Sequence, residues 1–171
     1  FCIVGEPTNP NKLGEMIKIG RRGSISGTIT ISGSQGHVAY PHLSNNPINT
    51  LVKICKKLNE HKLDRGNKNF QPSNLEITSI NVENTATNVI PASARAQFNV
   101  RFNNFHTSNS LKKKINSIVK NVSKQNKCKF KIDFHVSGES FLTKPNKTIY
   151  MAKNIIKKIT RVTPIFSTTG G

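Results

Sequence analysis

Two kinds of hydrophobic repeat alternate along this chain, and their order restricts the fold to a few arrangements. Apolar and polar residues alternate over 25–32, 96–102 and 130–136, a period typical of half-buried strands. A fourth strand is predicted over 75–82, where the apolar parity changes midway and indicates a bulge near Thr78-Ser79. Between these strands the apolar spacing becomes helical in two places.

Both predicted helices begin at residues that favour helix starts. Asn46-Pro47 combines an N-cap with a first-turn proline and predicts a helix to about Glu60. A second apolar helix stripe begins at Thr107 or Ser108. The order over 25–137 is therefore β-α-β-β-α-β. It predicts an α+β, ferredoxin-like domain with two helices on one face of a four-stranded antiparallel sheet.

The apolar faces of these elements define the expected core. The strand side is expected to contain Phe98, Val100, Phe130, Ile132 and Phe134. The helix side is expected to contain Ile48, Leu51, Val52, Leu111, Ile115 and Ile118.

The segments on either side of this unit carry apolar residues but no complete core. Residues 1–6 are predicted to form a short buried strand. A helix over 149–159 and a strand at Ile165-Phe166 are predicted near the other end. We therefore expect 1–22 and 139–171 to be parts of a second domain, most of which lies outside this chain.

The net charge of +18 at pH 7 admits two interpretations. A basic ferredoxin-like module that binds nucleic acid is one of them. A solvated, lysine-rich surface is favoured, because the lysines alternate with core residues instead of forming one block. In addition, Phe98 and Phe102 share the predicted core face. The opposite face carries Gln97, Asn99 and Arg101, and so offers no aromatic ring for stacking on bases.

Cysteine usage and hydropathy give the expected compartment. Cys2, Cys55 and Cys128 are odd in number and far apart, which favours reduced thiols in the cytoplasm. No apolar run approaches the roughly 20 residues that span a bilayer, so a membrane is not an expected partner. Nucleic acid is not expected as a partner either, because the open sheet face offers no aromatic ring for stacking.

Several loop and strand residues carry groups suited to acyl chemistry. His37 follows Gly36 after a strand, and its imidazole can donate a hydrogen bond to a developing oxyanion. Arg21 and Arg101 can hold carboxylates in a bidentate fork, which lysine cannot do. On the sequence alone, a surface histidine and solvated arginines remain open alternatives.

Other candidates are weaker when taken singly. Glu6 lies at the end of the first predicted strand, where a carboxylate can ligate a metal, although a glutamate before proline is more often a loop residue. Asn88 lies in a polar loop, where asparagine commonly forms turns. The glycines of Ser167–Gly171 can present backbone amides to a carboxylate.

In order and spacing, these segments resemble the di-zinc aminoacylase/deacylase family of M20-type metallopeptidases. The motifs that carry the resemblance are Gly5-Glu6-Pro7-Thr8, Ile19-Gly20-Arg21-Arg22-Gly23-Ser24, Gly36-His37-Val38-Ala39-Tyr40-Pro41-His42 and Ser167-Thr168-Thr169-Gly170-Gly171. The resemblance implies that 1–22 ends one catalytic-domain segment, 23–138 is a lid and dimerisation domain, and 139–171 begins the returning catalytic segment. The 83–86 loop departs from the family's usual Gly-Thr-Gly, which puts the reach of Asn88 in question.

The same resemblance implies roles for individual residues. Glu6 would ligate one of two Zn²⁺ ions, for which Co²⁺ could substitute, and His37 would reach the active site of the partner subunit in a homodimer. Substrate binding would fall to Arg21, Tyr40, Asn88, Arg101, Ser137, Gly170 and Gly171. The other metal ligands and the general base are expected outside this chain, so the chain alone is expected to be inactive.

The implied activity is hydrolysis of an amide bond in a substrate that carries several carboxylates. The Ile19–Ser24 and Gly36–His42 segments favour N-succinyl-diaminopimelate, on the route to lysine and peptidoglycan, over the acetylornithine-type substrate of a related deacylase. The rival from another class is the basic nucleic-acid-binding module described above.

Overall fold

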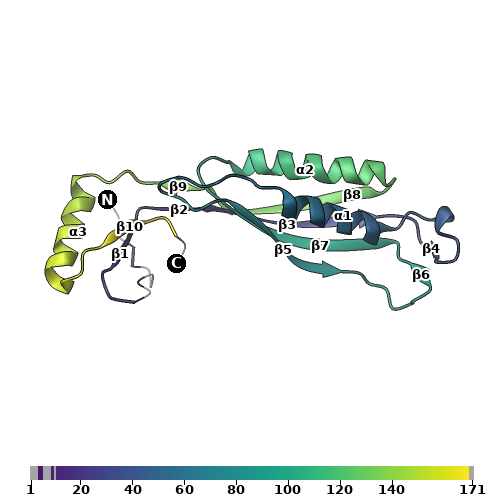
Figure 1. The fold of residues 1–171 in the computed structure, drawn as a ribbon, viewed down its shortest axis with the longest axis horizontal. Coiled ribbons are helices and arrows are strands. Elements are labelled where there is room, and N and C mark those ends of the chain that lie inside the picture. The colour runs from purple at the N-terminus through teal and green to yellow at the C-terminus, as the bar shows by residue number, and fades with distance from the viewer. Residues whose placement is uncertain (1–3, 6–8, 10, 170–171) are drawn as a thin grey trace.

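A four-stranded antiparallel sheet with both of its helices on one face forms the larger part of this elongated molecule (Figure 1). The computed structural model describes residues 4, 5, 9 and 11–169. In spatial order the strands are β5 (Asn74–Asn81), β7 (Ser93–Phe102), β3 (Gly23–Ser32) and β8 (Lys129–Gly138). The helices are α1 (Pro47–Glu60), which packs mainly on β7, and α2 (Ser108–Gln125), which packs mainly on β8. The chain order β3-α1-β5-β7-α2-β8 confirms the predicted ferredoxin-like arrangement.

Local sequence accounts for where the helices begin. The Asn46 side chain accepts a hydrogen bond from the Ile48 amide at 2.9 Å, and Pro47 occupies the first turn. Thr107 and Ser110 form a reciprocal capping box, with each side-chain oxygen accepting from the other residue's amide. The expected bulge in β5 is also present, since the register with β7 shifts between Ile77 and Ser79.

In the core, two phenylalanine rings of β7 pack over glycines of the neighbouring strand β3. The register of β3 and β7 places Phe98 opposite Gly27 and Phe102 opposite Gly23. A Cβ atom on Gly27 would lie only 2.4 Å from Cζ of Phe98, so the ring occupies the space of the missing side chain. Phe98 and Phe102 are both buried, as predicted, and lie away from the open face of the sheet.

Two expectations about the core are wrong in detail. Val52 is 54% exposed, because it lies about 100° around α1 from Leu51, and Ile54 takes the buried position instead. Ile48 and Ile118 on the helices are only partly buried, and so are Phe130, Ile132 and Phe134, which face the core from one strand. Their strand β8 is the last in the sheet and has β3 as its single described neighbour.

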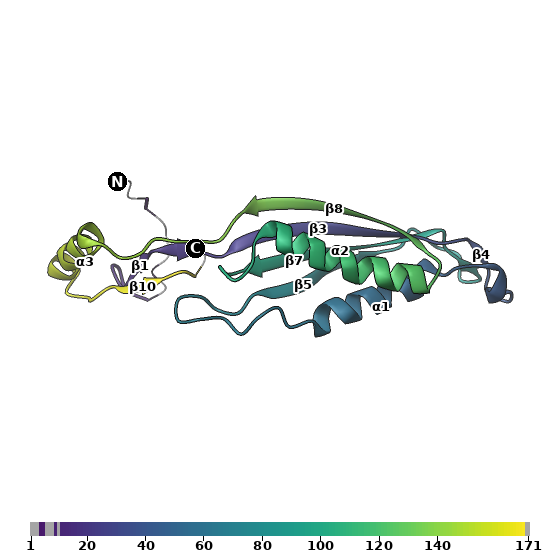
Figure 2. The same ribbon diagram turned by 90° about the horizontal axis from the view of Figure 1, so that it is seen from above.

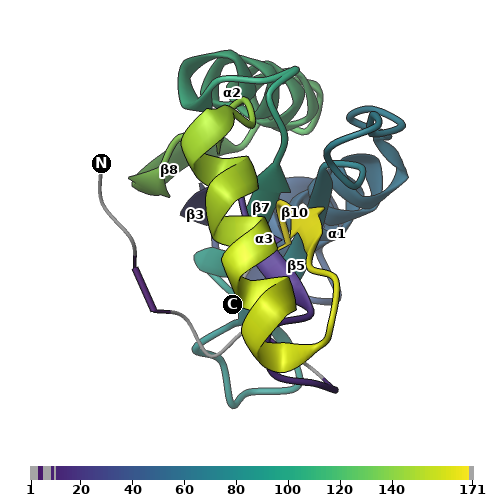
Figure 3. The same ribbon diagram turned by 90° about the vertical axis from the view of Figure 1, so that its left-hand side faces the viewer.

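A smaller unit lies at one end of the molecule, beyond the sheet (Figures 1 and 3). It contains α3 (Lys147–Thr160) and a parallel pair formed by β1 (Met16–Lys18) and β10 (Ile165–Ser167). An antiparallel pair, β2 (Gly20–Arg21) with β9 (Phe141–Leu142), joins this unit to the sheet. The buried strand predicted over 1–6 is not seen at the two of its residues that the structure describes, and Val4 is exposed.

The opposite end of the molecule is a narrow tip (Figure 2). It contains a two-stranded pair of β4 (Gly36–His37) and β6 (Val89–Ile90), together with the short 3₁₀ helix η1 (Pro41–Leu43). None of the helices in the described part of the chain is both long enough and apolar enough to cross a membrane.

Candidate substrate-binding and catalytic site

The described candidate residues fall into two groups at opposite ends of the sheet. Arg21, Arg101 and Ser137 lie at the end of the sheet next to the smaller unit, and we call them the hinge-end group. Arg101 pairs there with Ser24, near the start of β3. His37, Tyr40 and Asn88 form a tip group beyond the other end of β3. The ten residues of β3 separate the groups by about 30 Å at the usual rise per residue. One small substrate cannot touch both groups of the same chain.

Backbone pairing holds Asn88 beside His37 at the tip. His37 pairs with Val89, and the Val38 amide donates to the Asn88 carbonyl oxygen at 3.0 Å. The Asn84 side chain donates to the carbonyl oxygens of Ala86 and Val89 and so fixes the turn before Asn88. The altered 83–86 loop therefore still brings Asn88 and His37 together within one chain.

The hydrogen bonding of His37 favours one tautomer of its ring. Its Nδ1 accepts a hydrogen bond from the Ala39 amide at 3.1 Å, so the proton of the neutral ring resides on Nε2. The side chain is exposed, and the Tyr40 ring lies 6.1 Å away, tilted by 52°. The Nε2–H of an exposed imidazole near a phenol ring is a suitable donor to an oxygen that gains negative charge.

The hinge-end group presents guanidinium groups over one end of the open sheet face. Arg101 is exposed on β7 between Ser24 of β3 and Asn74 of β5. Arg21 lies next to β8, since a Cβ on Gly138 would be 3.3 Å from its Nη2. No ion pair within the described ranges involves either arginine, so both forks remain available for carboxylates of a ligand.

Arg22, the neighbour of Arg21, has a different environment. Its Nη1 donates to the carbonyl oxygen of Pro72 and to Oδ1 of Asn74, both at 3.2 Å. These contacts tie the start of β5 to the segment that enters β3. Arg22 is therefore occupied by structural contacts, in contrast to Arg21.

Three predicted site residues, Glu6, Gly170 and Gly171, lie outside the described residues. Within the described residues, no three His, Cys, Asp or Glu side chains are grouped closely enough to hold a metal ion. The residues in view therefore do not form a zinc site by themselves, and the roles derived for them below do not pass through a metal.

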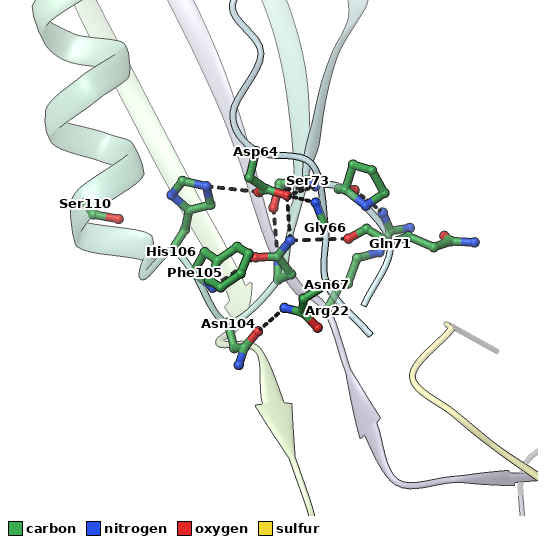
Figure 4. A network of polar contacts seen from close by, with 12 residues as sticks. Arg22, Asp64, Gly66, Asn67, Gln71, Ser73, Asn104, Phe105, His106 and Ser110 are labelled. Atoms are coloured by element: carbon green, nitrogen blue, oxygen red, sulfur yellow. Dashed lines mark hydrogen bonds and ion pairs between the residues drawn. The ribbon is translucent and has the colours of Figure 1, made fainter. Parts of the chain in front are cut away.

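A polar network around Asp64 was not anticipated from the sequence (Figure 4). The Asp64 carboxylate, whose side chain is 9% exposed, accepts hydrogen bonds from the Gly66 amide at 2.6 Å and from Asn103 Nδ2 at 2.7 Å. Its other oxygen lies 3.1 Å from Nε2 of His106. Burial by itself raises the pKa of Asp64, but hydrogen bonds from Ser73, Gly66 and Asn103 outweigh burial and lower it to about 2.

Two histidines outside the sequence motifs, His61 and His106, are partly buried. The His106 side chain is only 15% exposed because it packs against Asp64. His61 is half-buried, and burial, followed by the charge of Lys114, lowers its pKa. The sequence offered only the Asp64–Gly66 spacing of a local turn as a signal, because Asn103 and His106 lie about 40 residues further along the chain.

Comparisons with known proteins agree with this architecture. Residues 19–127 match the M20 family of peptidase dimerisation domains. Over 171 residues the chain is 63% identical to succinyl-diaminopimelate desuccinylase of Pelagibacter ubique, covering 100% of this chain and 44% of that protein. It is 50% identical to the enzyme of the same name from Parvibaculum lavamentivorans, with 99% and 43% coverage. The chain thus spans less than half the length of these relatives.

Solved structures resemble the chain in fold at much lower sequence identity. The aminopeptidase PepT of Bacillus cereus superposes with a TM-score of 0.77 at 17% identity and covers 95% of this chain and 42% of its own. A tripeptidase of Staphylococcus aureus superposes with a TM-score of 0.75 at 16% identity, with 94% and 41% coverage. Both similarities extend beyond the sheet to most of the chain.

Proposed function

Because the chain belongs to the M20 peptidase dimerisation-domain family, we propose that it forms the lid and hinge of an amide hydrolase that releases succinate from N-succinyl-diaminopimelate. The observation that carries this proposal is the 63% identity to a desuccinylase over the whole chain. The guanidinium groups of Arg21 and Arg101, which form no ion pair with any described residue, support a substrate with several carboxylates. In the cell, the reaction would belong to lysine and peptidoglycan synthesis in the cytoplasm.

The hinge-end group would bind the substrate in its own subunit. Arg21 and Arg101 approach the same sheet end from different strands, so their forks can take two carboxylates that lie apart on one molecule. Ser137, exposed on β8, adds a hydroxyl donor at that end. The backbone amides of Gly170 and Gly171 would complete the carboxylate contacts.

The tip group would act in the partner subunit of a homodimer formed through the lid domain. About 30 Å of β-sheet separates the tip group from the hinge-end group of its own chain, which supports a role in trans. His37 would donate from Nε2 to the amide oxygen as it becomes an oxyanion. Tyr40 and Asn88, held beside His37, would contact the substrate from the same side.

We further propose that the whole protein binds two Zn²⁺ ions, replaceable by Co²⁺, with Glu6 as one ligand and the other ligands beyond this chain. When bound, such ions polarise the amide carbonyl and lower the pKa of a bound water. The described residues of this chain would bind, orient and hydrogen-bond the substrate.

Release of succinate by the whole, zinc-loaded protein tests this proposal. We expect turnover of N-succinyl-diaminopimelate and loss of turnover on chelation, with recovery when Zn²⁺ is restored. N-acetylornithine serves as the comparison substrate. Turnover of N-acetylornithine without succinate release would assign the chain to a deacetylase, and tight binding of RNA by a zinc-free protein would revive the nucleic-acid interpretation.

Arg101 tests the substrate-binding assignment within this chain. We expect Arg101→Lys to lower kcat/KM by about 10-fold or more, because a point charge cannot replace a bidentate fork. Arg95→Lys is the matched control, since Arg95 is exposed on the same face of β7 near its other end. Steady-state kinetics of both variants give the comparison, and equal kcat/KM values would make Arg101 an ordinary solvated residue.

A further inference from the structure

Three segments that are distant in sequence meet at Thr168, which is 6% exposed. Thr168 directly follows β10, and its hydroxyl donates a hydrogen bond to the Asn69 carbonyl oxygen, 99 residues earlier in the chain. Its methyl carbon would lie 3.2 Å from a Cβ on Gly20 of β2. Thr168 therefore contacts β2, which connects the smaller unit to the sheet. It also contacts the 64–73 loop, which leads into strand β5 of the sheet.

The β2–β9 pair, which connects the smaller unit to the sheet, is tightly packed beside Thr168. A Cβ on Gly20 would lie 2.4 Å from the Phe141 carbonyl oxygen, so the two backbones of β2 and β9 are in close contact. The Ile19 amide donates to the Ser167 carbonyl oxygen at 2.9 Å and extends the pairing of β1 with β10. The segment that carries Thr168 is thus bound along the strand that leads into the sheet.

The 64–73 loop is held firmly on the other side of the contact. Asn67 and Phe70 exchange two backbone hydrogen bonds, at 2.9 and 3.2 Å, which fix the turn that contains Asn69. Asn103, fully buried, donates from Nδ2 to both Asp64 and the Gln71 carbonyl oxygen. Figure 4 shows the Asp64–His106 and Asn67–Asn104 contacts, which tie the loop to the segment between β7 and α2.

We propose that Thr168 is a positioning residue that fixes the Ser167–Thr169 segment relative to the hinge-end arginines. The loop that accepts its hydrogen bond runs into β5, whose residue Asn74 pairs with Arg101. The segment that donates the bond runs into Gly170-Gly171. The role of Thr168 in substrate binding rests on the proposed function. The Asp64 network would thus act at a distance, by holding the Asn69 carbonyl oxygen in place.

Thr168→Val in the whole protein removes the hydroxyl and keeps the shape of the side chain. We expect KM for N-succinyl-diaminopimelate to rise by about 2- to 12-fold, the range that corresponds to one net hydrogen bond. The value of kcat should change less than twofold, because a displaced carboxylate-binding segment weakens ground-state and transition-state binding alike. Thr168→Ser keeps the hydroxyl and should restore KM, whereas Thr163→Val, an equivalent change at an exposed site, should leave it unaltered.

Hydrogen exchange provides a readout that does not depend on activity. In Thr168→Val, the amides of Ile19 and Phe70 should exchange about 2- to 12-fold faster, while amides of β3 and β7 keep their wild-type rates. If Thr168→Val is not soluble, Thr168→Ala serves for the same measurements. Unchanged exchange at Ile19 and Phe70 would overturn the inference, whatever KM does. If the wild-type protein releases no succinate, the proposed function fails, while the exchange data still decide whether Thr168 joins the two units.

Discussion

Phe98→Ala should destabilise the domain formed by the four-stranded sheet and its two helices by about 3–5 kcal/mol, as for other buried phenylalanines truncated to alanine. The ring is 1% exposed, covers Gly27 on the neighbouring strand and contacts the Phe134 ring edge-to-face at 6.1 Å. Its loss leaves a cavity over Gly27 of β3 and beside Phe134 of β8, and uncovers the backbone at Gly27. Native-state hydrogen exchange at the amides of β3 and β7 measures the free energy of opening in the whole protein.

The contact between Phe98 and Gly27 can be tested from both sides. Gly27→Val should also be strongly destabilising, because its Cβ would lie 2.4 Å from the ring. In the Phe98→Ala background the same valine has room, so the double variant should lose less stability than the sum of the two single losses. Phe105→Ala is the control, since that ring is 60% exposed. Additive losses would mean that the ring does not occupy the space over Gly27.

The fold was predictable because its signals are local. The alternation in β3, β7 and β8 and the helix starts at Asn46 and Thr107 each depend on a few adjacent residues. Even the bulge in β5 could be inferred, because a change of parity can be reconciled with one buried face only by an extra residue. The order of elements then leaves few ways to form a sheet.

Details that depend on partners distant in sequence were not predictable. The choice between Val52 and Ile54 follows from the exact rotation of α1 on the sheet. The partial burial of Phe130, Ile132 and Phe134 follows from the edge position of β8, which is set by strand order and not by their own alternation. Similarly, Asp64 finds Asn103 and His106 only after α1, β5 and β7 have brought the two loops together.

In the candidate site, too, residue types could be predicted from the sequence, whereas their relative positions could not. Residue chemistry singled out His37, Arg21 and Arg101, but the separation of the tip group from the hinge-end group appears only when β3 is built as one uninterrupted strand. The tautomer of His37 likewise depends on a contact that no motif specifies, namely the Ala39 amide at Nδ1. The structure therefore places the candidate residues in two separate groups with defined positions.

His37→Ala should lower kcat by about 10²–10³-fold and leave KM nearly unchanged, because its hydrogen bond would form mainly as charge develops on the amide oxygen. Zinc content should stay at the wild-type level, since His37 is not proposed as a ligand. His42→Ala is the control, because His42 is a second exposed imidazole in the same loop. A loss of zinc in His37→Ala, measured by elemental analysis, would mean that this histidine is a metal ligand instead.

If the tip group and the hinge-end group of partner subunits share one active site, a complementation is predicted that a site built from one chain could not show. Mixing His37→Ala with Arg101→Ala gives mixed dimers in which one active site has its own Arg101 and receives His37 from the partner. The other active site in each mixed dimer lacks both groups. With random exchange in a two-fold symmetric dimer, the mixture should recover about a quarter of wild-type activity. Subunit exchange is verified by mass spectrometry of tagged chains. If both parents and the exchanged mixture are equally inactive, His37 acts within its own chain, and the lid must then bend far enough to close the 30 Å of sheet that separates the groups here.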